Sequence, residues 1–144
     1  MRKSEKGVTL IELLTVVVVV AVLASIAVPS YRRYLLRAQR SDATTALLRL
    51  QSAEEKFFLQ YGAYTTDLTS NAPTGLGQTS SRSERGYYQL VVAPTTTGYD
   101  AVASVVSGGG QGDDKKCASF KVTERGVKSA LDSANATSTD ECWR

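Results

Sequence analysis

Residues 6–12 read Lys-Gly-Val-Thr-Leu-Ile-Glu, and they open an apolar run that continues to Val28. A helix needs about 20 apolar residues to cross the hydrocarbon of a bilayer, at about 1.5 Å of rise per residue. The run from Val8 to Val28 meets this length and follows a basic leader, residues 1–7. Glu12 is its one carboxylate. Because a charge inside a membrane segment costs about 2.5–3.5 kcal/mol, the sequence predicts a functional partner for Glu12.

Three other interpretations of this stretch explain less of it. A secretory signal also has a basic start, and Ser25-Ile26-Ala27 would serve as its cleavage site, but its apolar core is normally uncharged. A plain membrane anchor leaves Glu12 and the Lys6-Gly7 junction without a role. A buried core helix is rarely so long and so uniformly apolar in a chain of 144 residues.

The stretch resembles the class III leader of type IV pilins and of the related secretion pseudopilins. The resemblance implies that a prepilin peptidase cuts the chain after Gly7 and N-methylates Val8. It also implies that Glu12 pairs with the N-terminal amine of a neighbouring subunit. Valine stands at position 8, where phenylalanine is usual in the family, but cleavage depends on the glycine.

The resemblance also gives the orientation of the chain. It implies the inner membrane of a bacterium, with the N-terminus in the cytoplasm and the domain in the periplasm, and later an extracellular pilus. Charge alone does not decide the orientation, because the positive charge of the arginines after the apolar run is about as strong as that of the leader before it. We interpret these arginines as a solvated collar at the lipid headgroups, and contact with acidic residues of neighbouring subunits is the alternative. They are Arg32, Arg33, Arg37 and Arg40.

Pro29 ends the apolar run. Proline has no N–H, so it leaves the carbonyl of Ser25 unpaired in a regular helix, which predicts a kink and a hinge at this position. Pilins carry a proline here, and their helix can lose regularity around it in a filament. The resemblance therefore assigns Pro29 to assembly, together with Glu12.

After Asp42 the chain has an amphipathic helical pattern. Apolar residues recur at steps of three and four, which places them on one face of a helix. We expect one helix from about Val8 to Tyr61, with Gly62 as its C-cap. Its membrane and assembly half is residues 8–29 and its amphipathic half is residues 30–62. The apolar positions are Ala43, Ala46, Leu47, Leu50, Ala53, Phe57 and Tyr61.

The remainder of the chain predicts a loop and a sheet. Residues 63–86 are rich in Thr, Ser, Asn and Gly and are expected to form a long αβ-loop. Within residues 87–144, four strands are expected, with a flexible turn over Gly108–Asp114 between the second and third. The predicted fold is α+β, a long N-terminal helix packed on a four-stranded antiparallel sheet, as in pilins. The strands are Tyr87–Ala93, Tyr99–Val106, Ala118–Thr123 and Val127–Leu131.

The chain has two cysteines, Cys117 and Cys142, and no histidine. In an exported chain, an isolated pair indicates one disulfide, which here would tie the C-terminal tail to the third strand. In pilins the segment bounded by these cysteines is the exposed D-region. The Tyr-Gly-x-Tyr motif at residues 61–64 and the final Glu141-Cys142-Trp143 are similar to the E-type minor pilins.

No catalytic constellation occurs in the sequence, so we expect neither enzymatic activity nor a cofactor. A metal site is not expected either. Asp113 and Asp114 lie beside Lys115 and Lys116, and two neutralised acids are too few for a calcium loop. We interpret this segment as a solvated turn.

The leading hypothesis is a structural subunit, a minor pilin that polymerises with other pilins through its helix. Twitching motility, adhesion and DNA uptake are the expected roles. The net charge of +3 gives no global argument for nucleic acid. Local basic residues still support an alternative, a DNA-binding minor pilin receptor in natural transformation, and a type II secretion pseudopilin is a further one. The candidate DNA-binding residues are Arg82, Arg85, Lys115 and Lys116, with Tyr87 and Tyr88 for stacking.

Overall fold

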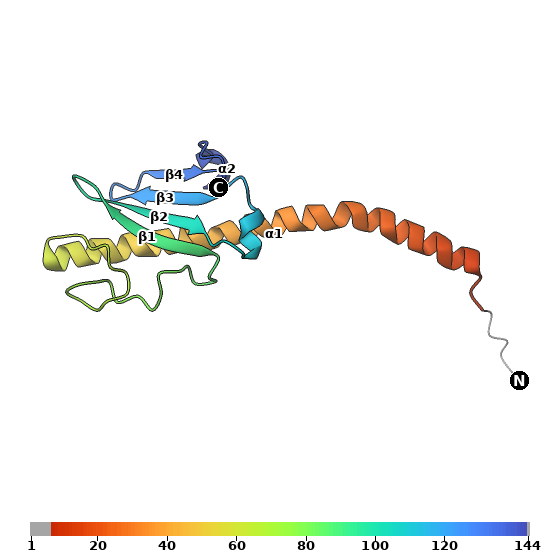
Figure 1. The fold of residues 1–144 in the computed structure, drawn as a ribbon, viewed down its shortest axis with the longest axis horizontal. Helices are drawn as coiled ribbons and strands as arrows, with labels where there is room; N and C mark the ends of the chain where they lie inside the picture. Colours follow the sequence, from red (N-terminus) through yellow and green to blue (C-terminus); the bar gives the residue numbers. More distant parts are fainter. Residues whose placement is uncertain (1–6, 144) are drawn as a thin grey trace, which may run out of the picture. The chain divides into compact units, whose positions relative to one another are not determined.

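A computed structural model describes residues 7–143 (Figure 1), so the predicted leader lies outside the described residues except for Gly7. Helix α1 spans Leu10–Tyr61 and continues through Pro29, so the proline does not end the helix. The helix ends as predicted, because Gly62 adopts a φ of 70° and donates its N–H to the carbonyl of Phe58 at 2.8 Å. The chain forms two compact units, one up to Leu35 and one from Leu36 onward.

The four predicted strands are present, and each predicted end agrees with the structure to within one residue. They form one antiparallel sheet in the order β1-β2-β3-β4. A short 3₁₀ helix, η1 (Gly110–Asp113), precedes β3, and a single helical turn, α2 (Thr139–Cys142), follows β4. The strands are β1 (Tyr88–Pro94), β2 (Tyr99–Val105), β3 (Ser119–Thr123) and β4 (Lys128–Leu131).

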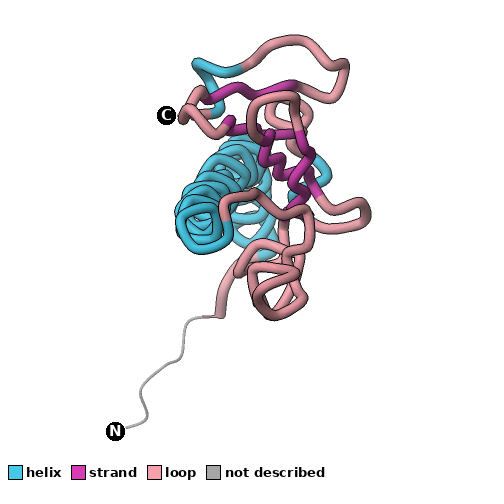
Figure 2. Tube along the Cα trace, turned by 90° about the vertical axis from the view of Figure 1, so that its left-hand side faces the viewer, coloured by secondary structure: helices cyan, strands magenta, loops and turns pink. Residues whose placement is uncertain are grey.

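The part of α1 after Leu36 lies along one face of this sheet (Figures 1 and 2). Side chains alternate along a strand, so every second residue points toward the helix. Tyr88, Tyr99 and Phe120 are fully buried by this alternation, and they pack with Leu47 and Leu50 of α1 in one core. The predicted apolar face of the helix is therefore the core face. Tyr61, which was predicted on that face, is 45% exposed at the end of α1.

The αβ-loop, residues 63–86, is irregular as predicted, but it is held at several points. Hydrogen bonds from Ser70 and Thr69 organise its first part on the carboxylate of Asp67 and lower the pKa of that group to about 2. Its last part lies beside β1, where Ser83 donates to the carbonyl of Tyr88 at 2.9 Å. The N–H of Leu90 donates to Ser81 at 2.7 Å. The loop thereby shields part of an edge strand from pairing with other chains.

The prediction of a flexible turn over Gly108–Asp114 is wrong for the second half of this segment. Gln111 is fully buried in η1, and its amide donates to the hydroxyl of Tyr88 at 2.9 Å and to the carbonyl of Leu36 at 3.3 Å. A buried polar side chain needs such partners, and here they lie on two distant elements. The glycines that favour flexibility in the sequence are thus fixed by one glutamine among them.

Glu54 is a charged residue inside the core, with no exposed surface. One of its oxygens accepts a hydrogen bond from the N–H of Thr65 at 3.2 Å, which ties the start of the αβ-loop to α1. Burial raises the pKa of this carboxyl, although the bond from Thr65 opposes the shift. The ionised form is therefore disfavoured in the folded chain.

We predict that Glu54→Gln removes a pH dependence of stability. A carboxyl whose pKa is raised on folding contributes stability that is fully present below its unfolded pKa, about 4.3, and is lost as pH rises through the folded pKa. The free energy of unfolding of the variant, relative to the native chain, should therefore increase between pH 4 and pH 7. Urea unfolding of the full chain in detergent micelles, with the disulfide intact, measures this difference.

The control for this prediction is Glu55→Gln, one residue along α1 and partly exposed. Glu55→Gln removes the same charge as Glu54→Gln, so an equal effect of the two variants would indicate net charge rather than burial as the cause. A flat difference for Glu54→Gln would contradict the prediction.

Candidate functional site

The first candidate region is the N-terminal part of α1. Its large apolar side chains between Val8 and Val28 are all exposed, with fractions from 53% at Val18 to 84% at Leu10. The helix is long and apolar enough to cross a membrane. So much apolar surface is stable only under lipid or under other apolar helices.

The predicted processing and assembly residues lie at the start of this segment. Gly7 and Val8 are exposed and precede the first helical residue, Leu10. The backbone N–H of Glu12 donates to the hydroxyl of Thr9 at 3.3 Å, and Thr15 donates to the carbonyl of Glu12 at 2.8 Å. These bonds fix the first turn of the helix and leave the Glu12 side chain exposed.

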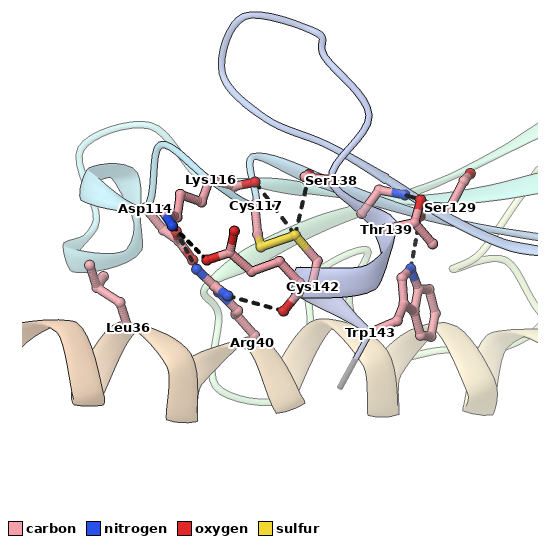
Figure 3. The surroundings of a disulfide bond; sticks show 12 residues. Leu36, Arg40, Asp114, Lys116, Cys117, Ser129, Ser138, Thr139, Cys142 and Trp143 are labelled. Atoms are coloured by element: carbon pink, nitrogen blue, oxygen red, sulfur yellow. Dashed lines mark hydrogen bonds and ion pairs between the residues drawn. A yellow bond between two sulfur atoms is a disulfide. The ribbon is translucent and has the colours of Figure 1, made fainter.

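The second candidate region is the C-terminal tail (Figure 3). Cys117 and Cys142 form the predicted disulfide, with their Cα atoms 5.8 Å apart, and it joins the residues before β3 to α2. The tail is also bonded along β4, because Ser138 donates to the carbonyl of Ala130 at 2.9 Å. The indole N–H of Trp143 donates to the carbonyl of Ser129 at 2.8 Å. The polar tail is therefore fixed to the sheet by one covalent bond and several hydrogen bonds.

Beside the disulfide, Arg40 and Asp114 form a buried ion pair. The guanidinium donates two hydrogen bonds to the carboxylate, Nε to Oδ2 at 2.6 Å and Nη2 to Oδ1 at 2.9 Å. The two residues are 7% and 5% exposed. Through Nη1, Arg40 also donates to the carbonyl of Glu141 at 3.4 Å.

This pair corrects two of the predictions. Arg40 does not belong to a solvated collar, and Asp114 does not belong to a solvated turn. A bidentate pair can be buried because each charge neutralises the other and the hydrogen bonds are satisfied. Asp113, by contrast, is exposed as predicted.

The four candidate DNA-binding residues are all exposed. Strands β1 and β3 are both antiparallel to β2, so they run in the same direction. Arg85 precedes β1, and Lys115 and Lys116 precede β3, which places these three at one end of the sheet. Arg82 lies at the edge of the sheet, opposite Gln89, the second residue of β1.

Lys116 is partly neutralised. Its ammonium lies 2.8 Å from the carboxylate of Glu141 in α2, and the two side chains are 68% and 48% exposed. The hydrogen bond from Lys116 lowers the pKa of Glu141. An exposed pair of this kind contributes little stability, about 0.2–1 kcal/mol, so another anion can compete for the lysine.

Sequence reasoning missed the roles of Glu54, Gln111 and Arg40. Glu54 follows Leu50 by four residues and precedes Phe57 by three, so the helical period could have placed it on the core face. Arg40 likewise precedes the buried Ala43 by three residues. The period does not indicate the partner of Arg40, which lies 74 residues away in the sequence.

An apolar, exposed N-terminal helical segment continues into a helix packed on an antiparallel sheet, and a disulfide closes the C-terminal segment. These features define the class of the type IV pilins. The family described as type IV minor pilin ComP, DNA uptake sequence receptor, matches residues 29–121, and the chain belongs to this family. The prokaryotic N-terminal methylation motif matches residues 2–28.

Two similar proteins are type IV major pilins. The type IV major pilin protein PilE of Neisseria gonorrhoeae is 39% identical over 88 residues, which cover 61% of this chain and 50% of the relative. PilA, the type IV major pilin protein of Myxococcus xanthus, is 33% identical over 88 residues, with coverages of 61% and 38%. The chain thus spans half or less of the length of these relatives. A solved type IV pilin from Shewanella oneidensis has a TM-score of 0.44 at 22% identity, covering 65% of this chain and 89% of that one.

We predict that the buried pair is much more sensitive to substitution than the exposed one. Asp114→Ala leaves the guanidinium of Arg40 buried without its partner, which should cost roughly 3–5 kcal/mol of unfolding free energy. Glu141→Ala at the exposed pair should cost less than about 1 kcal/mol. Urea unfolding of the full chain in micelles, followed by the fluorescence of Trp143, measures both.

A double variant tests the reason for the difference. Arg40→Met with Asp114→Leu removes both charges, so it should be less destabilising than Asp114→Ala alone. If the single variant is as stable as the native chain, the pair does not hold the tail as described.

Proposed function

We propose that this chain is a minor subunit of a type IV pilus. The observation that supports it best is the exposed apolar surface from Val8 to Val28, which has no cover within the described chain. Before assembly the inner membrane covers this surface, with the N-terminus in the cytoplasm and the domain in the periplasm. In the pilus, the helices of other pilins replace the lipid.

Processing by a prepilin peptidase is part of this proposal. The enzyme would remove residues 1–7 after Gly7, and Val8 would become the methylated N-terminus. The match of residues 2–28 to the N-terminal methylation motif supports this assignment. The remaining chain then consists of an assembly half, residues 8–29, an amphipathic half, residues 30–62, the αβ-loop, residues 63–86, and the sheet with its D-region, residues 87–144.

Glu12 and Pro29 have distinct roles in assembly. The carboxylate of Glu12 forms an ion pair with the N-terminal amine of a neighbouring subunit. This pair neutralises both charges and sets the register between helices. Pro29 removes one helical hydrogen bond at the end of the apolar segment, where the helix can adapt to its neighbours.

We predict that Glu12→Ala abolishes incorporation into filaments but not membrane insertion. Loss of one partner of a buried pair costs roughly 3–5 kcal/mol, so incorporation should fall by about a hundredfold or more. The amount of the chain in sheared filaments and in the membrane fraction, from cells that also contain the native pilins, gives the measurement. Mass spectrometry of the native chain should show an N-methylated Val8 in both fractions.

Thr15→Ala is the control, because it changes a polar side chain one turn from Glu12 without changing charge. This variant should enter filaments at the native level. Native incorporation of Glu12→Ala would show that the carboxylate has no partner in the filament.

DNA binding is a second candidate function. The family that matches residues 29–121 is described as a DNA uptake sequence receptor, and all four candidate basic residues lie in that range. Arg82 and Arg85 are the stronger pair, because Lys116 is engaged by Glu141. Arg82 also lines a groove between α1 and the αβ-loop, whose lining includes Asp42 and the Arg49–Glu84 ion pair. Arginines at the rim of a groove suit contacts with phosphates.

We predict that Arg82→Gln with Arg85→Gln weakens binding of duplex DNA to the full chain in micelles. The salt dependence of the affinity should also fall by about one for each lost phosphate contact. The double change Lys115→Gln with Lys116→Gln should have a smaller effect, because Glu141 already neutralises one of these lysines. Fluorescence anisotropy of a labelled duplex at several salt concentrations provides the affinities.

The control double variant is Lys56→Gln with Arg125→Gln, which removes two exposed charges elsewhere. Binding that is equally reduced in all three double variants would indicate an effect of net charge alone. If the chain does not bind DNA even at low salt, the DNA-binding proposal is wrong and the structural function alone remains.

A further inference from the structure

A groove of about 780 Å³ lies within the domain, between α1 and the C-terminal tail. Ala38 and Ser41 of α1 lie on one side of it, and Lys116 and Cys142 on the other. Figure 3 shows Arg40, Lys116 and Cys142 close together at this place. The small side chains on α1 leave the space open, and the disulfide fixes the opposite wall.

The lining of this groove is basic. Arg37, Arg40 and Lys116 contribute three cations, against one carboxylate, Glu141. Arg40 is fixed by Asp114 and is not available to exchange partners. Lys116 is exposed, and Glu141 is its one ion-pair partner within residues 7–143, so an incoming anion can replace that carboxylate at the ammonium.

The groove is close to the membrane segment along the chain. Arg37 follows Val28 by nine residues, which span at most about 30 Å even when fully extended. While residues 8–28 are in a bilayer, the headgroups are therefore present at a high effective concentration. A DNA molecule in solution has no such tether, which favours lipid as the ligand of this groove.

We propose that this groove binds the phosphate headgroup of an anionic phospholipid while the chain is in the membrane before assembly. Lys116 contacts the phosphate, and Glu141 competes with it for the ammonium. The proposal rests on the insertion of residues 8–28 that the proposed function requires. Basic side chains near a bilayer gain enough from anionic lipid to change the docked fraction by about fivefold per charge.

The chain carries its own reporter for this docking. Trp143 is the only tryptophan, and it follows Cys142 directly. The experiment places the full chain in bilayers of phosphatidylcholine, with or without about one third phosphatidylglycerol, and with a trace of headgroup-spin-labelled lipid. Quenching of Trp143 reports the approach of the groove to the headgroups.

The native chain should show stronger quenching in bilayers with phosphatidylglycerol, and the increase should disappear at high salt because the charges are screened. Lys116→Gln should reduce the ratio of docked to undocked chain by about fivefold. Glu141→Gln should raise this ratio, because it removes the competing carboxylate. The two variants therefore have opposite expected effects at one ion pair.

The matched controls are Lys121→Gln and Asp100→Asn, which change the partly exposed Lys121–Asp100 pair outside this groove. They carry the same changes in net charge and should leave the quenching at the native level. If they shift it as much as the groove variants, the attraction is a property of net charge and the proposal is wrong. Equal quenching of the native chain in both bilayers also overturns it.

Two further outcomes separate this proposal from other functions. If Lys116→Gln loses binding of duplex DNA but keeps the response to phosphatidylglycerol, the groove is a nucleic-acid site and the lipid proposal is overturned. If the full chain does not insert into either bilayer, the proposed membrane stage of the function fails first. A chain that inserts but does not respond to phosphatidylglycerol refutes the lipid site alone.

Discussion

The buried ion pair between Arg40 and Asp114 connects three segments that are far apart in the sequence. Arg40 belongs to α1, Asp114 precedes β3, and the second contact of Arg40 is the carbonyl of Glu141 in α2. Gln111 adds hydrogen bonds to Tyr88 and Leu36 next to the same pair. The disulfide then fixes α2 to the start of β3. A small sheet with a polar tail thus acquires a fixed position on its helix.

This arrangement lets one helix serve two environments. Every residue of the buried core lies after Leu36, so the sheet uses only the second part of α1. The apolar side chains from Val8 to Val28 remain available for lipid and for other pilins. In the function we propose, a domain with its own core passes from the membrane to a filament without refolding, because only the environment of residues 8–28 has to change.

The basic residues of the domain are neutralised to different extents. Buried Arg40 is fully committed to Asp114, whereas exposed Lys116 is held by a carboxylate that another anion can replace. Arg82 and Arg85 have exposed positions beside β1. A near-neutral protein can therefore carry local basic surfaces, for which we propose DNA phosphates at one position and lipid phosphates at another. Their strength depends on which acids lie beside them.

The sequence by itself determined the features that depend on neighbouring residues. The apolar run to Val28 indicates a membrane helix, Gly62 ends that helix, and alternating residues define four strands within one residue of their observed ends. The pairing of Cys117 with Cys142 followed because the chain has no other cysteine. Only the tertiary structure decided that Arg40, Gln111 and Asp114 are buried. Their partners lie as many as 75 residues away, and a polar residue leaves no local pattern that distinguishes a buried partner from water.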